Sequence, residues 1–458
     1  MRGLAGHLAR SGATVAASAL VVGAFALAPA AAKFAPAASR PGRVSTHPAA
    51  GTPALAPSGS TEQVRQLVQC GTTMFAVGRF TKISQNGTTY TRDNVFSFSA
   101  VAPYRITSWT PSTNGEVNSI AVAQGCTHAY IGGSFTQVDG QPATNIAEIN
   151  THSNTMVSQW PHSANNMVNT LLLVPKGRLL VGGDFTTING SGEARFYASL
   201  NAATGQNDGY LKLHLRGHYV YPGVHFNTTD IYNQQLSPDG RQVLAEGVFT
   251  SVQGQPRQQI FMLNLDATQG NVSGWYSSEF NQYCNDGHPL YVKTAAWSPD
   301  GSTVYVADTG KIPWNWNKKY PLTSMCDVAA AFPATQAGGL TRRWANYTGC
   351  YTLLSVAAGS GAVYIGGHER YADDANGCKF AGPGAVKAPG LGGLAPRTGA
   401  LMLNSSHTAG LYSRARGLGA DDMLLTGAGL WIASDNLQGS ATCGGVPNHA
   451  GICFLPYS

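Results

Sequence analysis

The sequence predicts an all-β fold, a seven-bladed β-propeller of four-stranded antiparallel blades, on three observations. A glycine turn followed by a β-rich stretch recurs along the chain at intervals of about 50–70 residues, as expected for propeller repeats. No stretch after residue 35 keeps its apolar residues at helical spacing. The 55 glycines also argue against long helices, because glycine is a poor helix former.

The repeated unit is an apolar run that usually ends in small residues. Its copies read TMFAVGRF (73–80), AYIGGSF (129–135), LLVGGDF (179–185), VLAEGVF (243–249), VYVAD (304–308), VYIGG (363–367) and LWIAS (430–434). A turn glycine precedes each copy: Gly71, Gly125, Gly177, Gly240, Gly301, Gly361 and Gly429. The last three copies lack the phenylalanine, so there the repeat depends on turn and spacing.

Residues 116–162 give the clearest single blade. Turn residues separate its four apolar or β-branched runs, VNSIAV, AYIGGSF, NIAEIN and MVSQW. Four antiparallel strands repeated around an axis leave only short, protected edges. The aromatic residues that recur after the second strand or near the fourth are predicted to pack between blades: Phe80, Phe135, Phe185, Phe249, Trp109, Trp160, Tyr210, Trp275, Trp344 and Tyr412.

Three features of this pattern resemble known repeat families. The GG-x-F-T-x-V-x-G stretch at 132–140 resembles the bacterial delta-60 repeat, and a double glycine followed by a spaced tryptophan is similar to kelch repeats. LSPDG (236–240) and WSPDG (297–301) resemble the hairpin turn of bacterial WD-like propellers. The resemblance covers residues 62–458. It implies a binding or scaffolding module, because most members of these families have that role and only scattered members are enzymes.

The N-terminal region predicts export. Residues 1–32 have basic residues, an apolar run and small residues in the order of a secretory signal peptide, with cleavage expected after Ala30 or Ala32. The alternative is an uncleaved N-terminal anchor. Residues 33–61 are rich in Ala, Pro and Ser and read as a linker before the propeller of residues 62–458. We expect a secreted, extracellular protein without a stable membrane span in the mature chain.

The end of the chain raises the question of ring closure. Strands are expected near 422–426, at 430–434 and at 451–456, which leaves no residues for a fourth strand before Ser458. An unpaired edge is a liability, so part of the linker, around Pro53 to Pro57, is predicted to pair outside the third strand. Prolines there fit only an edge strand.

Charge and composition limit the possible partners. Only 11% of residues are charged, and the basic residues behind the net charge of +6 are scattered. This pattern does not form a nucleic-acid footprint. The expected partner is an extracellular glycan or protein.

The eight cysteines predict a disulfide framework in an oxidising compartment. No C-x-x-C occurs, which removes support for a zinc ribbon or a thioredoxin-like site. The register of the repeats places matching cysteines at the same end of neighbouring blades. The predicted pairs are Cys284–Cys326, Cys350–Cys378, Cys443–Cys453 and, at the opposite end, Cys70–Cys126.

The longest loops gather at one end of the predicted propeller, where binding residues are usually found. Trp314, Trp316 and Tyr320 lie in a Pro, Asn and Lys-containing loop, and alternate residues of an extended segment point the same way. Such aromatics suit stacking on sugar rings or on a partner surface. Packing within the loop remains an equal alternative.

Polar candidates lie in the other long loops. His368, Asp373 and Asp374 are candidate ligand-binding residues. The two aspartates, with Asn376 and Gly377, resemble part of a calcium loop, but a full set of alternating oxygen ligands is missing, which favours an Asx-rich turn. Calcium is the one cofactor left open. The loop histidines have no fixed metal geometry and read as surface residues, and no metal ligand is assigned: His214, His218 and His225.

No catalytic motif is present: the sequence lacks a G-x-S-x-G elbow, an H-E-x-x-H pair and a phosphate-binding loop. Glu246 and Asp308 are compatible with a carboxylate pair for glycoside chemistry, or with buried groups hydrogen-bonded between strands. The sequence therefore favours a secreted binding or scaffold module over an enzyme. The alternative is a secreted hydrolase, lyase or oxidase with its site among the long loops. The ligand and the oligomeric state do not follow from the sequence.

Overall fold

The computed structural model describes residues 42–218, 228–282, 284, 290–310, 324–378, 380–402, 419–436, 442–443, 446–447 and 449–458. In these ranges the chain is all-β, and its only helices are the short 3₁₀ turns η1 (Gln124–Cys126) and η2 (Ser278–Asn281). None of these turns has the length or apolar character that a membrane crossing requires. Trp314, Trp316, Tyr320, His225 and Tyr412 lie outside these ranges.

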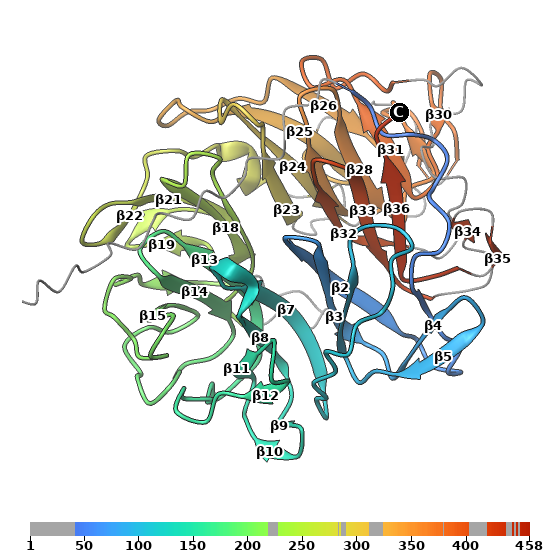
Figure 1. Ribbon diagram of the computed structural model, residues 1–458. Coiled ribbons are helices and arrows are strands. Elements are labelled where there is room, and N and C mark those ends of the chain that lie inside the picture. The colour runs from blue at the N-terminus through green and yellow to red at the C-terminus, as the bar shows by residue number, and fades with distance from the viewer. Residues whose placement is uncertain are drawn as a thin grey trace, which may run out of the picture.

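The fold is a β-propeller. Antiparallel sheets are set around a common centre, and β2, β7, β13, β23 and β32 lie nearest to it (Figure 1). Three of the sheets have four strands: β7 (Glu116–Val122), β8 (His128–Ser134), β11 (Ile146–Asn150) and β12 (Thr155–Met156); β17 (Asp230–Leu236), β18 (Gln242–Val248), β21 (Ile260–Leu265) and β22 (Gly270–Val272); β23 (Tyr291–Trp297), β24 (Thr303–Thr309), β25 (Val328–Pro333) and β26 (Trp344–Tyr347).

Other sheets around the centre have three strands: β2 (Gln63–Cys70), β3 (Thr73–Arg79) and β6 (Val95–Ser99); β13 (Val168–Val174), β14 (Arg178–Gly183) and β15 (Tyr197–Asn201); β27 (Leu353–Ala358), β28 (Val363–Gly367) and β31 (Leu391–Leu394); β32 (Ala420–Leu425), β33 (Gly429–Ser434) and β36 (Ile452–Pro456). In each of these, a single bridge occupies the position where the prediction has a fourth strand: Phe98–Ile106, Leu200–Asn207, Leu394–Leu401 and Val44–Tyr457. The outermost strand is therefore reduced to one pairing in these sheets.

Short strands form small additional sheets in the connections: β1 (Ala54–Leu55), β4 (Lys82–Gln85) and β5 (Thr88–Thr91); β9 (Gln137–Val138) and β10 (Gln141–Pro142); β16 (Leu215–Arg216), β19 (Ser251–Val252) and β20 (Gln255–Pro256); β29 (Tyr371–Ala372) and β30 (Val386–Lys387); β34 (Thr442–Cys443) and β35 (Val446–Pro447). Most of them follow the second strand of a sheet. They extend the connection between the second and third strands, as the long loops of the sequence indicate.

The hydrophobic core lies between neighbouring sheets. The predicted inter-blade aromatics inside the described ranges are all buried: Phe80, Phe135, Phe185, Phe249, Trp109, Trp160, Tyr210, Trp275 and Trp344. Small residues at the end of the second strand are required because the next sheet is so close. A Cβ at Gly132 would collide with Val168, and a Cβ at Gly182 would collide with Ile231.

A left-handed residue precedes the third strand of every sheet around the centre. It is Asn94, Asn145, Phe196, Gln259, Asp327, Gly390 or Gly451, each with a positive φ. The carbonyl groups of most of these residues accept hydrogen bonds from the end of the second strand, as Asn94 does from Gly78 at 3.0 Å. Asn and Gly tolerate this conformation best, which explains the asparagine that recurs before the third strands of the first copies.

Residues 43–49 run beside the last strand and close the ring. The Ser45 N–H donates to the Pro456 carbonyl at 2.7 Å, and the Ala49 N–H donates to the Phe454 carbonyl at 2.8 Å. The pairing segment thus lies upstream of Pro53–Pro57. Residues further along pair with β4 instead, where Ala54 lies opposite Ser84. Because Val44 and Leu55 are buried, this part of the Ala, Pro and Ser-rich stretch contributes to the core.

Three disulfides tie loops and turns together. Cys70–Cys126 joins the first hairpin turns of two neighbouring sheets. Cys284–Cys326 joins the segment before β23 to the segment just before β25. Cys350–Cys378 joins the segment after β26 to the loop between β29 and β30. These are the same pairs that the register of the repeats predicts. The pairing Cys443–Cys453 involves a Cys443 side chain outside the described part of the chain, so it remains a prediction.

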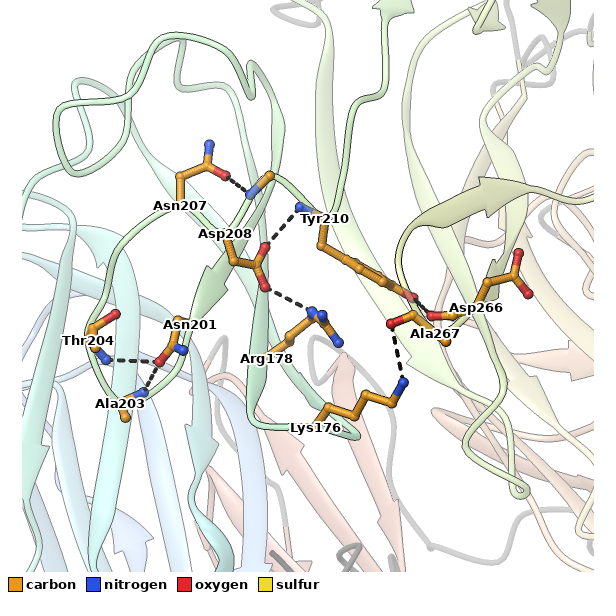
Figure 2. A network of polar contacts seen from close by, with 11 residues as sticks. Lys176, Arg178, Asn201, Ala203, Thr204, Asn207, Asp208, Tyr210, Asp266 and Ala267 are labelled. Atoms are coloured by element: carbon orange, nitrogen blue, oxygen red, sulfur yellow. Dashed lines mark hydrogen bonds and ion pairs between the residues drawn. The ribbon is translucent and has the colours of Figure 1, made fainter. Parts of the chain in front are cut away.

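A polar network connects the sheet of β13, β14 and β15 to the sheet of β17, β18, β21 and β22 (Figure 2). It lies at the hairpin end, where a tight turn joins the first and second strands of each sheet. The Lys176 ammonium donates to the Ala267 carbonyl at 3.2 Å, and the Tyr210 hydroxyl donates to the Asp266 carbonyl at 2.8 Å. Arg178 lies 4.0 Å from the centre of the Tyr210 ring and pairs with Asp208 at 2.8 Å. The surface at this end is therefore structured by contacts between sheets.

Candidate binding site

Every first strand of the sheets around the centre contains a β-bulge at the same place. The register between first and second strand shifts across one residue in each sheet. The residues at the bulge are Arg65, Asn118, Asn169, Tyr232, Lys293, Leu354 and Asp421. A bulge re-aims a side chain that would otherwise follow the alternation of the strand.

All of these bulge residues line one cavity of about 360 Å³. The cavity therefore lies among the first strands, where the sheets converge in Figure 1. We call it the axial cavity. The rest of its wall is mostly polar: Gln66, Glu116, Ser119, Met167, Thr170, Asn233 and Asp422.

Side chains of the bulge residues hold neighbouring sheets in place. The Asn118 amide donates to the Val168 carbonyl at 3.2 Å, and the Asn169 amide donates to the Ile231 carbonyl at 3.4 Å. The Tyr232 hydroxyl donates to the Val292 carbonyl in the same way. The wall is thus preorganised by contacts that reach from one sheet to the next.

The next residue along each strand adds further links. The Gln66 side-chain oxygen accepts from the Ile120 N–H at 2.7 Å. The Ser119 hydroxyl accepts from the Leu171 N–H at 2.9 Å. Each contact satisfies a backbone donor of the following sheet, so the polar wall also stabilises the packing of the sheets.

The axial cavity carries charges of both signs. Arg65 pairs with Glu116 at 2.6 Å. Burial lowers the pKa of Lys293, while the nearby Asp230 raises it and Arg65 lowers it further. Burial raises the pKa of Asp421 to about 7, against the opposing effect of a hydrogen bond from Gln63. Burial also raises the pKa of Asp422 to about 6. Near neutral pH, part of this wall is therefore able to exchange protons.

The axial cavity is not evident from the sequence. A signal is present in the strands themselves, where a polar residue follows the first apolar residue, as in VRQLV (64–68) and VNSIAV (117–122). Apolar alternation alone hides this residue, because the bulge takes it out of the pleat. The sequence shows the polar residue in most first strands, but it does not show that a bulge lies at that residue.

The structure places some predicted site residues near disulfide-anchored loops. His368 follows β28 and is exposed, although partial burial of its ring lowers its pKa. The Asp373 carboxylate accepts a hydrogen bond from the Asn346 amide at 2.6 Å. The Asp374 carboxylate accepts one from the Gly382 N–H at 2.9 Å, and burial raises the pKa of both acids. Among the described residues, no hydrogen bond or ion pair joins His368 to either aspartate.

Glu246 and Asp308 do not form a carboxylate pair facing an open cleft. They belong to neighbouring sheets, in β18 and β24, and both are fully buried. Burial raises the pKa of Glu246 to about 8, and burial together with Asp327 raises the pKa of Asp308 well above its usual value. Both acids therefore sit inside the packing between strands.

In the part of the chain that the structure describes, no group of three or more His, Cys, Asp or Glu side chains is placed to hold a metal ion. His214 and His218 lie in the loop around β16, apart from any such group. A second cavity of about 500 Å³ lies at the hairpin end, between Tyr305, Arg343 and Arg397.

The comparisons with known proteins support the fold. Residues 175–197 match the model of a domain of unknown function, DUF5122, described as a beta-propeller. Among curated proteins, none matches this sequence.

Two solved structures are similar in shape at very low identity. The structure of U3-55K has 10% sequence identity and a TM-score of 0.46, and it covers 89% of this chain and 99% of its own. The crystal structure of the RRP9 WD40 repeats has 9% identity and a TM-score of 0.49, with 90% and 99% covered.

Proposed function

We propose that this protein is a secreted, seven-bladed β-propeller of four-stranded blades, related to delta-60 and kelch-like repeats, that binds an extracellular glycan or protein. The single observation that carries the binding function is how the long loops are anchored. Cys326, just after the loop that holds Trp314 and Trp316, is bonded to Cys284. Cys378 is bonded to Cys350 in the next sheet.

Loops that are fixed at their ends on a rigid scaffold lose less conformational entropy when they bind a partner. The aromatic residues proposed for contact are Trp314, Trp316 and Tyr320, with His368 in the neighbouring loop. Exposed aromatic side chains beside polar residues are suited to sugar rings and to protein surfaces. The absence of a catalytic motif in the sequence favours binding over chemistry.

A glycan array probed with the mature protein tests this function. Binding to a defined group of glycans should be lost in the Trp314→Ala/Trp316→Ala variant and kept in an Asp266→Asn variant at the hairpin end. A protein partner would instead be captured from culture medium by the native protein and not by the tryptophan variant. Equal binding by both variants would remove the aromatic loop from the proposal.

Calcium is proposed as a structural ion for the loop of Asp373 and Asp374. Both carboxylates already lie in a turn with backbone and amide donors, and the Asp374 Oδ2 atom has no hydrogen-bond partner. Metal analysis of the purified protein and array binding in chelator test this. A metal-free protein whose binding is unchanged by chelator would contradict it.

Export is proposed from the order of basic, apolar and small residues in the first 32 positions, and the disulfides fit an oxidising compartment. N-terminal sequencing of the protein recovered from the medium should start after Ala30 or Ala32. A sequence that begins at Met1 would argue for a retained N-terminus.

A further inference from the structure

The axial cavity presents hydrogen-bond acceptors that no residue in the described part of the chain uses. The Asn118 and Asn169 side chains donate through Nδ2 to neighbouring backbone carbonyls. No described residue donates to their Oδ1 atoms. Because both amides are fixed by these donations, their orientation is set before any ligand arrives.

A further acceptor lies at Asp421. Gln63 hydrogen-bonds this carboxylate, but its Oδ2 atom is shielded from solvent and has no hydrogen-bond partner among the residues that the structure describes. A buried polar atom without a partner costs free energy, so its persistence at a cavity wall needs a reason. Asp421 lines the cavity, and a rotation of its side chain would bring this atom within reach of a ligand hydroxyl.

Cationic donors line the same cavity. Arg65 and Lys293 both contribute to its wall, and the Lys293 Nζ atom lies 5.9 Å from the centre of the Tyr232 ring. Carboxylates of Glu116, Asp421 and Asp422 stand in the same wall. A strongly charged ligand of either sign would therefore meet repulsion as well as attraction.

A hydroxyl group suits such a wall, because it donates to a carboxylate or amide oxygen and accepts from an ammonium, guanidinium or amide. The volume of about 360 Å³ lies at the small end of the range for ligand pockets. We infer that the axial cavity binds a small hydroxyl-rich ligand of the monosaccharide class, held by Asn118, Asn169, Asp421 and Lys293. This site is formed by first-strand residues and not by the loop aromatics, and it does not depend on the glycan function proposed for those loops.

Calorimetry of the mature protein with D-glucose, N-acetyl-D-glucosamine and D-glucuronic acid tests the inference. At least one sugar should bind with a millimolar or tighter Kd. Asn169→Leu, which keeps the side-chain size and removes the acceptor, should weaken binding at least tenfold. Asp421→Asn should weaken it by a similar factor. Leu354→Trp should abolish binding by filling the cavity.

The matched control is Asp266→Asn, an exposed carboxylate at the hairpin end that should bind the sugar as the native protein does. Thermal unfolding and the glycan array verify that each axial variant is folded, since both readouts depend on other parts of the molecule. Loss of sugar binding with array binding kept supports a separate axial site. Sugar binding blocked by Leu354→Trp supports it even where the array shows nothing for the native protein.

The methyl glycoside and a tetrasaccharide of the bound sugar distinguish a free sugar from the end of a glycan chain. Equal affinity for all three indicates that a chain end enters the cavity, and binding of the free sugar alone indicates a monosaccharide ligand. The inference is overturned if none of the three monosaccharides binds the native protein. It is overturned equally if binding persists unchanged in both Asn169→Leu and Leu354→Trp.

Discussion

The Asp422 carboxylate accepts a hydrogen bond of 3.0 Å from the backbone N–H of Leu67. These residues are 355 positions apart, in the first strands of the last and the first sheets. The contact repeats the link by which Gln66 reaches Ile120 and Ser119 reaches Leu171. The contact that closes the ring is therefore of the same kind as the contacts within it: a side-chain oxygen next to the bulge accepts a hydrogen bond from a backbone N–H of the adjacent sheet.

Replacing Asp422 should weaken this closure. Asp422→Leu leaves the Leu67 N–H without its acceptor and should lower the free energy of unfolding by about 1–3 kcal/mol. Asp422→Asn keeps an acceptor oxygen and should lose less. Urea unfolding of both variants checks this, with Asp266→Asn as an exposed control. Equal stability of the leucine and native proteins would show that the contact contributes nothing.

Glu246 should make stability depend on pH. Apart from its own backbone N–H, neither carboxyl oxygen has a hydrogen-bond partner within the described ranges, and burial raises the pKa of Glu246 to about 8. The folded protein thus keeps this proton between about pH 4.5 and 8, whereas the unfolded chain releases it. Stability should therefore fall as pH rises through this window, by up to about 1.4 kcal/mol per pH unit from this group.

Glu246→Gln removes the titration and should make the stability curve flatter between pH 5 and 8. Urea unfolding at each pH measures the slope. Asp266→Asn, at an exposed carboxylate, should leave the slope as it is in the native protein. An unchanged slope in Glu246→Gln would mean that Glu246 is already ionised in the folded protein.

Cys70–Cys126 should stabilise the contact between the first two sheets. It closes a loop with a sequence separation of 56 residues, and its loss in Cys70→Ser/Cys126→Ser should cost roughly 4 kcal/mol by the chain-entropy model. Unfolding with and without reductant checks this result. The difference between variant and native protein should shrink in reductant, and a difference that is already absent without reductant would contradict the expectation.

The N-terminal segment should be part of the folded unit. Val44 is buried, and its N–H donates to the Tyr364 hydroxyl at 3.0 Å. Val44→Asp places a charge in this site and should destabilise the protein by about 2–4 kcal/mol. His47→Asp, three residues away and exposed, is the control. Similar melting temperatures for both variants would separate this segment from the fold.

The repeat predicts much of the architecture because it arises from packing constraints that act on every sheet. The glycine at the Gly133 position recurs in the first four copies because a Cβ there would collide with the first strand of the same sheet, and the phenylalanine at the Phe135 position is buried in each copy. The predicted second strand at 363–367 is β28 (Val363–Gly367), even though its phenylalanine is missing. Spacing therefore remains informative where the motif has decayed.

Two features could not be predicted from this one sequence. The segment that pairs with β36 is Val44–Ala49, because the closing pairing depends on where the chain crosses the last sheet and not on proline content. The axial cavity is formed by residues such as Arg65 and Lys293, which are far apart along the chain. These residues come together because the first strands of the sheets surround a common centre, and the local sequence around each residue does not show this arrangement.

The bulges assign the packing between sheets and the lining of the cavity to different residues of the same strand. In an ordinary strand, changing one side chain alters the face that packs against the neighbouring sheet. At Arg65, Asn118 or Lys293, the extra residue lies outside that alternation, so its replacement leaves the inward and outward faces of the strand in register. The lining of the cavity can thus change without shifting the register of the strand, and the cost of a change is set by the contact that the side chain makes with the next sheet, as Asn118 does with Val168.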